Sequence, residues 1–157
     1  MVEIGEEMPK VKLVDTEFNE VSIPGDASGK PVVVAFFPGA FTSVCTKEMC
    51  TFRDSMAQFN SVNAKLYAVS VDGPFANKVF RDTNKLNFPI LSDYNREAVE
   101  KFDVALNDFA KLKGYTAAKR AVFVADAKGV VKYRWVSNDP TVEPDYAEIN
   151  KALQEIQ

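Results

Sequence analysis

Short, nearly continuous apolar runs alternate along the chain with segments whose apolar residues repeat every three or four positions. The runs at residues 32–37 and 66–71 predict strands that are covered on both faces of a sheet. The spaced pattern that follows the first run, at Met49, Phe52, Met56 and Phe59, predicts a helix. The alternation indicates an α/β fold in which helices cover a central sheet.

The remaining pattern predicts a hairpin at each end of this arrangement and a helix that closes the chain. Residues 105–119 fit no single pattern, so we expect a long loop with some local structure there. In chain order we expect an N-terminal hairpin of 11–14 and 21–23, strand 32–37, a helix from Thr42 to about Asn60, strand 66–71, a helix from Asp72-Gly73-Pro74 to about Leu86, an extended segment 88–93, helix 95–102, a hairpin of 121–125 and 130–136, and helix 144–156.

Length and composition indicate one globular domain over residues 1–157. With 46% hydrophobic and 26% charged residues, the chain can bury a core without help from disulfides. A net charge of −3 gives no indication of a nucleic-acid or anionic-membrane partner. No apolar stretch approaches the roughly 20 residues that span a bilayer, and the acidic first ten residues do not resemble a signal peptide. We therefore expect a cytoplasmic protein.

The chain contains no histidine and two cysteines, Cys45 and Cys50. This excludes Ser-His and Cys-His nucleophile pairs and zinc sites built on histidine. There is no glycine-rich phosphate loop, and the spacing of Asp72 and Asp93 does not suggest a metal site. We expect no metal and no cofactor. In a reducing compartment, a disulfide between the cysteines is more often catalytic than structural.

Cys45 lies where strand 32–37 passes through a Pro38-Gly39 turn into the helix that begins near Thr42. The first turn of a helix has unpaired N–H groups and a partial positive charge, and both favour a thiolate. Without histidine, activation of Cys45 must come from the backbone, hydroxyls and cationic side chains. Because a lone cysteine is more often a small buried residue, the surrounding residues decide its interpretation.

These surroundings resemble the active site of the peroxiredoxins. In that family a proline is followed by three residues, a threonine or serine, two residues and the reactive cysteine, and Pro38, Thr42 and Cys45 match this spacing. Arg120, at the start of a late predicted strand, matches the context of the family's catalytic arginine, and Glu48 matches a common family position. The resemblance covers nearly the whole chain. It implies a thioredoxin-like fold, with a central mixed β-sheet flanked by helices and an N-terminal β-hairpin.

The resemblance also implies a thiol-dependent peroxidase for hydrogen peroxide and organic hydroperoxides. The Cys45 thiolate would attack the terminal peroxide oxygen and become a sulfenic acid. The Thr42 hydroxyl and Arg120 would stabilise the developing charge, and Pro38 would shield the thiolate from water. Thr42 could equally be a helix cap and Arg120 an ordinary cation at a strand start. Glu48 either orients an arginine or is an acid favoured by the helix dipole.

Two aromatic residues, Phe37 and Phe41, flank the predicted catalytic loop. We interpret them as walls of an apolar mouth through which substrate would reach Cys45. On this hypothesis, replacing Phe41 with alanine changes the preference between hydrogen peroxide and bulky hydroperoxides.

The spacing of Cys45 and Cys50 resembles that of the Q-type, or bacterioferritin-comigratory, peroxiredoxins. In those proteins the second cysteine resolves the sulfenic acid as an intramolecular disulfide. Five residues along an intact helix separate the Cα atoms by roughly 8.6 Å, whereas a disulfide requires less than about 7 Å. Pairing would therefore require the first turns of the helix to unwind. The alternative is that Cys50 never pairs, and that an external thiol resolves a one-cysteine peroxidase.

Two other functions share the expected fold or the reactive cysteine. A thioredoxin-like disulfide reductase would need a Cys-x-x-Cys pair at the helix start, which the chain lacks. A redox-sensing or holdase protein that uses Cys45 as a switch stays open as an alternative. For the peroxidase, the expected reductant is thioredoxin, glutaredoxin or a low-molecular-weight thiol. The chain ends at Gln157 soon after its last helix, so we expect a monomer or homodimer instead of a large ring.

Overall fold

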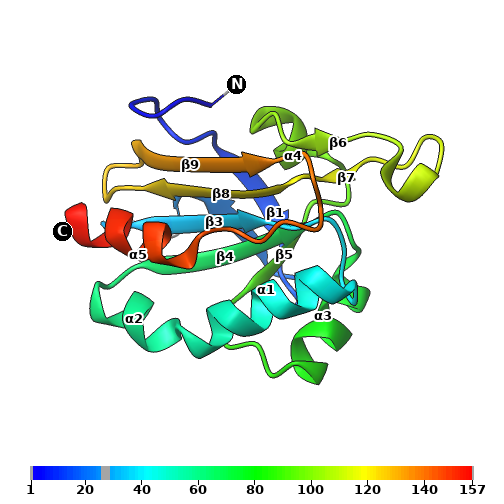
Figure 1. Cartoon of the computed structure of the whole chain (residues 1–157), viewed down its shortest axis with the longest axis horizontal. Helices are drawn as coiled ribbons and strands as arrows, with labels where there is room; N and C mark the ends of the chain where they lie inside the picture. The colour runs from blue at the N-terminus through cyan, green and yellow to red at the C-terminus, as the bar shows by residue number, and fades with distance from the viewer. Residues whose placement is uncertain (1, 26–28, 157) are drawn as a thin grey trace.

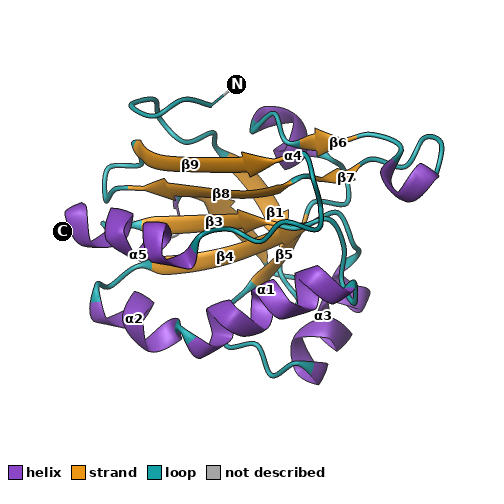
Figure 2. Cartoon of the chain, in the orientation of Figure 1, coloured by secondary structure: helices purple, strands orange, loops and turns teal. Residues whose placement is uncertain are grey.

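The computed structural model describes residues 2–25 and 29–156 and contains, within these ranges, a seven-stranded mixed sheet with helices on both faces (Figures 1 and 2). The strand order is β2-β1-β5-β4-β3-β8-β9. β3, β4 and β5 run parallel, while β8 and β9 extend one side and the N-terminal hairpin the other by antiparallel pairing. The strands are β1 (Val11–Val14), β2 (Glu20–Ile23), β3 (Val32–Phe36), β4 (Lys65–Ser70), β5 (Ile90–Ser92), β8 (Arg120–Ala125) and β9 (Val131–Ser137).

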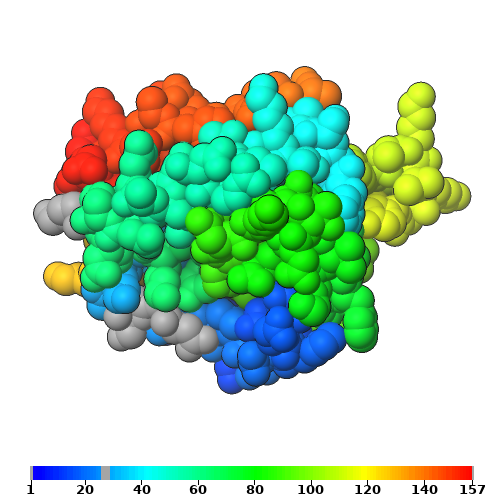
Figure 3. Space-filling view, turned by 90° about the horizontal axis from the view of Figure 1, so that it is seen from below, coloured from blue at the N-terminus to red at the C-terminus, as the bar shows by residue number. Residues whose placement is uncertain are grey.

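The helices divide the core into two layers, one on each face of the sheet. Val33 and Ala35 of β3 pack with α1, α2, α3 and α5, whereas Val34 and Phe36 pack on the other face with α4. This explains why β3 is apolar at every position, since both of its faces are buried. Figure 3 shows α1 and α3 side by side on the first face. The helices are α1 (Ser43–Asp54), α2 (Met56–Ser61), α3 (Pro74–Thr83), α4 (Glu97–Lys101) and α5 (Tyr146–Glu155).

The strand register gathers the candidate residues at one edge of the sheet. Phe36, the last residue of β3, pairs with Val69 of parallel β4 and with Ala121 of antiparallel β8. The loops that follow the parallel strands therefore leave at the same edge at which β8 begins. Arg120, the first residue of β8, consequently lies beside the loop that leads from β3 to Cys45.

Two predicted helices differ from the structure. The helix expected over 42–60 is interrupted at Ser55, whose hydroxyl donates to the Thr51 carbonyl at 2.9 Å and competes with the helical pattern. The helix expected to reach Leu86 ends at Thr83, and Lys85 takes the left-handed conformation that commonly ends helices (φ 52°). The other predicted elements are present, with ends that differ by a few residues.

Residues 105–119 form a projecting loop with local structure, as the sequence predicts (Figure 1). The short strands β6 (Ala105–Leu106) and β7 (Ala117–Ala118) pair at its base, and the 3-10 helix η2 (Phe109–Lys111) lies beyond them. Among all the helices of the described ranges, none is long and apolar enough to cross a membrane.

Candidate active site

Cys45 occupies the third position of α1, in its first turn, as the sequence predicts. Thr42 precedes the helix in an extended conformation, and its carbonyl accepts the first helical hydrogen bond from Thr46 at 2.9 Å. Phe41 has φ 65°, which turns the chain sharply before the helix starts. The side chain of Cys45 is fully buried, with 0% exposure. The sulfur of Cys45 is therefore not in contact with bulk solvent in this structure.

Thr42 occupies the N-cap position but does not cap α1 with its side chain. Its Oγ1 donates to the Gly39 carbonyl at 2.8 Å, and this hydrogen bond stabilises the turn that precedes the helix. The first-turn N–H groups of α1 are consequently not occupied by this hydroxyl. They remain available to an anion near Cys45, as helix N-termini commonly are.

Arg120 is the cationic partner of Cys45. Its Nη2 donates to Cys45 Sγ at 3.1 Å, and both side chains are buried. The guanidinium is held in place by two further acceptors, Glu48 Oε1 at 2.9 Å from Nη1 and the Pro140 carbonyl at 2.6 Å from Nη2. A fixed cation at hydrogen-bond distance stabilises a thiolate and can also donate to an oxygen that is bound beside it.

Glu48 lies in α1 with Cys45, and the guanidinium of Arg120 donates to both side chains. Glu48 is fully buried, and its Oε2 has no hydrogen-bond partner in the described part of the chain. Burial raises the pKa of Glu48 to about 8, although the charge and hydrogen bond of Arg120 lower it. Desolvation lowers the pKa of Arg120, but Glu48 and Cys45 outweigh it and leave that pKa raised. Arg120 thus keeps its positive charge near neutral pH, at hydrogen-bond distance from Cys45 Sγ.

The two aromatic residues expected to form an apolar mouth lie in different surroundings. Phe37 is fully buried and packs against Phe80 of α3, with ring centroids 5.9 Å apart. Phe41 is 54% exposed, and its ring lies 5.2 Å from that of Phe80. Of the two, Phe41 offers a surface to a solute. Pro38 is buried in the turn between β3 and α1.

Cys50 does not lie with the other candidate residues. It is partly exposed, and its Sγ is 3.8 Å from Asn84 Oδ1 at the end of α3. Both cysteines are free thiols. The fold thus brings together Cys45, Arg120 and Glu48 but leaves Cys50 on another side of α1.

Comparison with known proteins assigns the chain to a family, because residues 4–134 match the AhpC/TSA family. The chain belongs to this family of peroxiredoxins. It is 34% identical to the chloroplastic peroxiredoxin Q of Populus jackii over 152 residues, which cover 97% of this chain and 68% of that protein.

Two solved structures extend the comparison to the fold. A peroxiredoxin-like protein from Aquifex aeolicus superposes with a TM-score of 0.87 at 30% identity, over 99% of this chain and 88% of the other. Peroxidoxin BcpB from Mycobacterium tuberculosis gives 0.86 at 26% identity, over 100% and 99%. The predictions of a thioredoxin-like fold and of a thiol peroxidase are confirmed.

Two groups in this peroxiredoxin were not found from the sequence. The Pro140 carbonyl orients Arg120 from the loop between β9 and α5, and a backbone acceptor has no signature in a sequence. Asp72 accepts a hydrogen bond at 2.8 Å from the amide of Ala40, which lies in the loop between β3 and α1. Its position at a strand end, where functional side chains gather, was the available signal.

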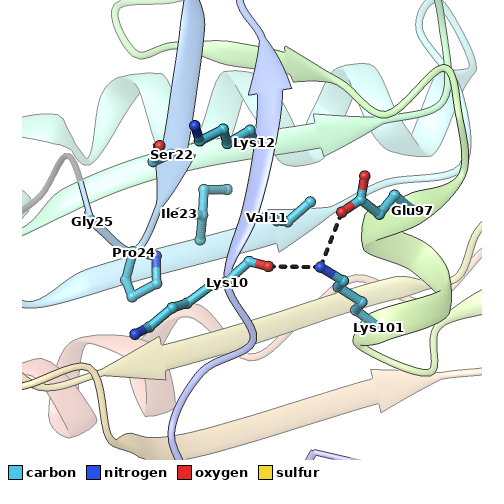
Figure 4. A pocket seen from close by; sticks show the side chains of 9 residues that line it. All are labelled: Lys10, Val11, Lys12, Ser22, Ile23, Pro24, Gly25, Glu97 and Lys101. Atoms are coloured by element: carbon cyan, nitrogen blue, oxygen red, sulfur yellow. Dashed lines mark hydrogen bonds and ion pairs between the residues drawn. The ribbon is translucent and has the colours of Figure 1, made fainter.

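A cavity among the described residues lies away from Cys45, between β1, β2 and α4 (Figure 4). It has a volume of about 580 Å³, and neither cysteine lines it. Lys101 at its wall donates to the Lys10 carbonyl at 3.0 Å and pairs with Glu97 at 3.0 Å. Among the described residues, no cluster of acidic or cysteine side chains could hold a metal ion.

Proposed function

We propose that this peroxiredoxin reduces hydrogen peroxide and organic hydroperoxides through a sulfenic acid on Cys45. The observation that carries the proposal is the 3.1 Å contact between Arg120 Nη2 and Cys45 Sγ at the first turn of α1. A thiolate is the nucleophile in such a reaction, and a buried guanidinium is the partner that keeps it ionised. The same guanidinium can donate to the peroxide oxygens as charge develops on them.

In the first step the Cys45 thiolate attacks the terminal oxygen of the hydroperoxide. A sulfur–oxygen bond forms, the oxygen–oxygen bond breaks, and sulfur gives up two electrons. The transferred oxygen remains as the sulfenic hydroxyl, and the alkoxide or hydroxide leaves after it gains one proton. Thr42, at the N-cap, and Arg120 are the side chains proposed to guide the substrate. Pro38, buried in the turn, would keep bulk water from the thiolate.

We further propose that Cys50 resolves the sulfenic acid. Its sulfur would attack Cys45 Sγ, forming a disulfide and releasing water, and an external thiol would reduce that disulfide. Both cysteines lie within α1, where five residues of intact helix keep their Cα atoms roughly 8.6 Å apart. The first turns of α1 must unwind for this step, and the Cys50 contact with Asn84 must break. Thioredoxin, glutaredoxin or a small thiol would supply the electrons in the cytoplasm.

The alternative is a one-cysteine peroxidase in which an external thiol attacks Cys45 directly. The observation that favours it is the contact of Cys50 with Asn84, which holds Cys50 on another side of the helix. Under this alternative α1 stays helical in every step.

Peptide mapping after one equivalent of peroxide, with no thiol added, separates the two. We expect a Cys45–Cys50 disulfide in the wild type and a trapped sulfenic acid on Cys45 in Cys50→Ser. A stable sulfenic acid on Cys45 of the wild type would refute resolution by Cys50 and support the one-cysteine alternative. Cys45→Ser is expected to consume no peroxide. Turnover by that variant at the wild-type rate would remove the proposal as a whole.

Exposed apolar residues near the catalytic loop support a homodimer over a monomer. Phe75 and Val79, one turn apart on α3, are 75% and 57% exposed, and Phe41 of the loop is 54% exposed. Phe18 lies 5.0 Å from Phe75, ring centroid to ring centroid. Large apolar side chains gathered on one surface commonly mark an interface. Sedimentation of the reduced and oxidised protein tests this, and a monomer at micromolar concentration would contradict it.

A further inference from the structure

Asp72 links the end of a central strand to the catalytic loop. It follows β4 and stands one residue before the N-cap of α3, Gly73. Its Oδ2 accepts a hydrogen bond from the Ala40 amide at 2.8 Å, across 32 residues of sequence. Ala40 lies in the turn between β3 and α1, five residues before Cys45. The carboxylate thus touches the backbone that leads into the reactive helix.

Buried polar side chains hold Asp72 itself in place, Ser70 at the carboxylate and Ser92 and Asn77 at the backbone carbonyl. The Ser70 hydroxyl lies 2.8 Å from Asp72 Oδ2 and 3.2 Å from Asn77 Oδ1, and its single proton favours the nearer acceptor. Ser92 Oγ donates to the Asp72 carbonyl at 2.6 Å, and Asn77 Nδ2 lies 3.3 Å from the same oxygen. Ser70, Asn77 and Ser92 are all buried. A group fixed in this way can fix whatever it binds.

The loop that Asp72 holds has a strained conformation. Phe41, directly after Ala40, has φ 65°, a left-handed conformation that is unfavourable for residues other than glycine. Three contacts hold the turn: the Ala40 bond to Asp72, the Thr42 hydroxyl on the Gly39 carbonyl, and the Phe41 ring on α3. The turn sets where α1 starts and therefore where Cys45 lies.

We propose that Asp72 is a positioning residue of the peroxidase reaction. By holding the Ala40 amide it fixes the start of α1, and so keeps Cys45 Sγ at hydrogen-bond distance from Arg120. The described contacts of Asp72 include neither Cys45 nor Arg120, so its effect passes through the backbone of the loop. The inference rests on the proposed function, since Cys45 must be the reacting group.

The test compares Asp72→Ala with a matched carboxylate that does not touch the loop. Asp93 is buried, whereas Asp72 is partly exposed, and Asp93 accepts hydrogen bonds from the Ala98 and Val99 amides at 2.9 Å each, at the start of α4. Asp93→Ala therefore removes as many bonds on the other face of the sheet. We expect Asp72→Ala to lower the second-order rate constant of Cys45 oxidation by peroxide at least about tenfold, towards the roughly hundredfold cost of a misplaced catalytic group.

Rescue separates positioning from general loss of stability. Asp72→Asn keeps an oxygen that can accept from the Ala40 amide, so it should recover most of the rate. Asp93→Ala should keep the wild-type rate even where its unfolding free energy falls below that of Asp72→Ala. Equal rates for folded Asp72→Ala and wild type, or equal losses in both alanine variants, would overturn the inference. A wild type inert to peroxide would instead defeat the proposed function.

Amide hydrogen exchange tests the tether without any reaction, and decides the matter if Asp72→Ala does not fold. The Ala40 amide of the reduced wild type should exchange slowly for a loop amide, and faster in Asp72→Asn, where the acceptor is uncharged. Exchange of Ala40 in the wild type at the rate of an unprotected amide would refute the tether.

Discussion

Replacing Glu48 with glutamine tests whether burial or the ion pair controls this carboxyl. Two effects oppose each other at Glu48: full burial favours the neutral acid, and Arg120 Nη1 at 2.9 Å favours the carboxylate. Burial is the larger effect and raises the pKa of Glu48 from 4.5 to about 8. Glutamine has nearly the same shape and can still accept from Arg120, but it cannot ionise. The variant therefore removes the titration and keeps the packing.

The sign of the effect follows from proton binding. Between pH 4.5 and about 8 the native protein keeps the Glu48 proton, whereas the unfolded chain has lost it. The native state binds more protons in this window, so its stability falls as pH rises, by at most about 1.4 kcal/mol per pH unit. Summed over the window, the loss approaches roughly 5 kcal/mol. The contribution is fully present below pH 4.5 and is lost as pH rises through about 8.

Denaturant unfolding of the reduced protein at several pH values across the window measures this difference. The unfolding free energy of wild type minus that of Glu48→Gln should fall steadily as pH rises. Glu100→Gln, at an exposed position of α4, provides the matched control and should give a profile parallel to wild type. A difference that stays constant, or that grows in favour of wild type with rising pH, would mean that Arg120 outweighs burial.

Three further predictions concern the site and the core. Arg120→Lys should lower the rate of Cys45 oxidation by on the order of 10²-fold, because one ammonium group cannot replace a guanidinium that binds three acceptors. Stopped-flow measurement of Cys45 oxidation tests this, and an unchanged rate would contradict it. Phe52→Ala leaves a cavity at a buried position of α1 and should lower the unfolding free energy by about 3–5 kcal/mol in a denaturation assay. Phe75→Ala, at a position that is 75% exposed, is the control and should have a small effect in the same assay. Phe41→Ala should change the ratio of rates with hydrogen peroxide and cumene hydroperoxide, and an equal ratio in both proteins would remove the proposed contact with substrate.

The fold could be predicted from the sequence because its strands are buried on both faces. Such strands are apolar throughout, and residues 32–37 and 66–71 show this pattern directly. The break at Ser55 could not be predicted from apolar spacing, because Met49, Phe52, Met56 and Phe59 keep helical periodicity across it. A hydroxyl that competes for a backbone carbonyl interrupts the helix without changing that periodicity.

For the site, side-chain chemistry could be predicted better than the backbone that positions it. The pattern of residues predicts Cys45 at a helix start and Arg120 at a strand start, and the structure brings Arg120 Nη2 within 3.1 Å of Cys45 Sγ. The groups that orient them, the Pro140 carbonyl and the Ala40 amide, are backbone atoms that every residue has. Their roles depend on the path of the chain in space, which local pattern does not determine.

The contacts of α3 with the reactive helix also limit how far that helix can unwind. Asp72, before α3, holds Ala40 ahead of the helix, and Asn84, after α3, accepts a bond from Arg53 Nη1 at 2.6 Å on its carbonyl. A hydrogen bond from a charged donor contributes about 1.5–3 kcal/mol, more than the weak thiol contact of Cys50 with the same residue. Since Cys45 and Cys50 both lie between Ala40 and Arg53, the segment between these two anchors can uncoil while both hold. The disulfide proposed between Cys45 and Cys50 would then require only that segment to rearrange, while the sheet and α3 stay unchanged.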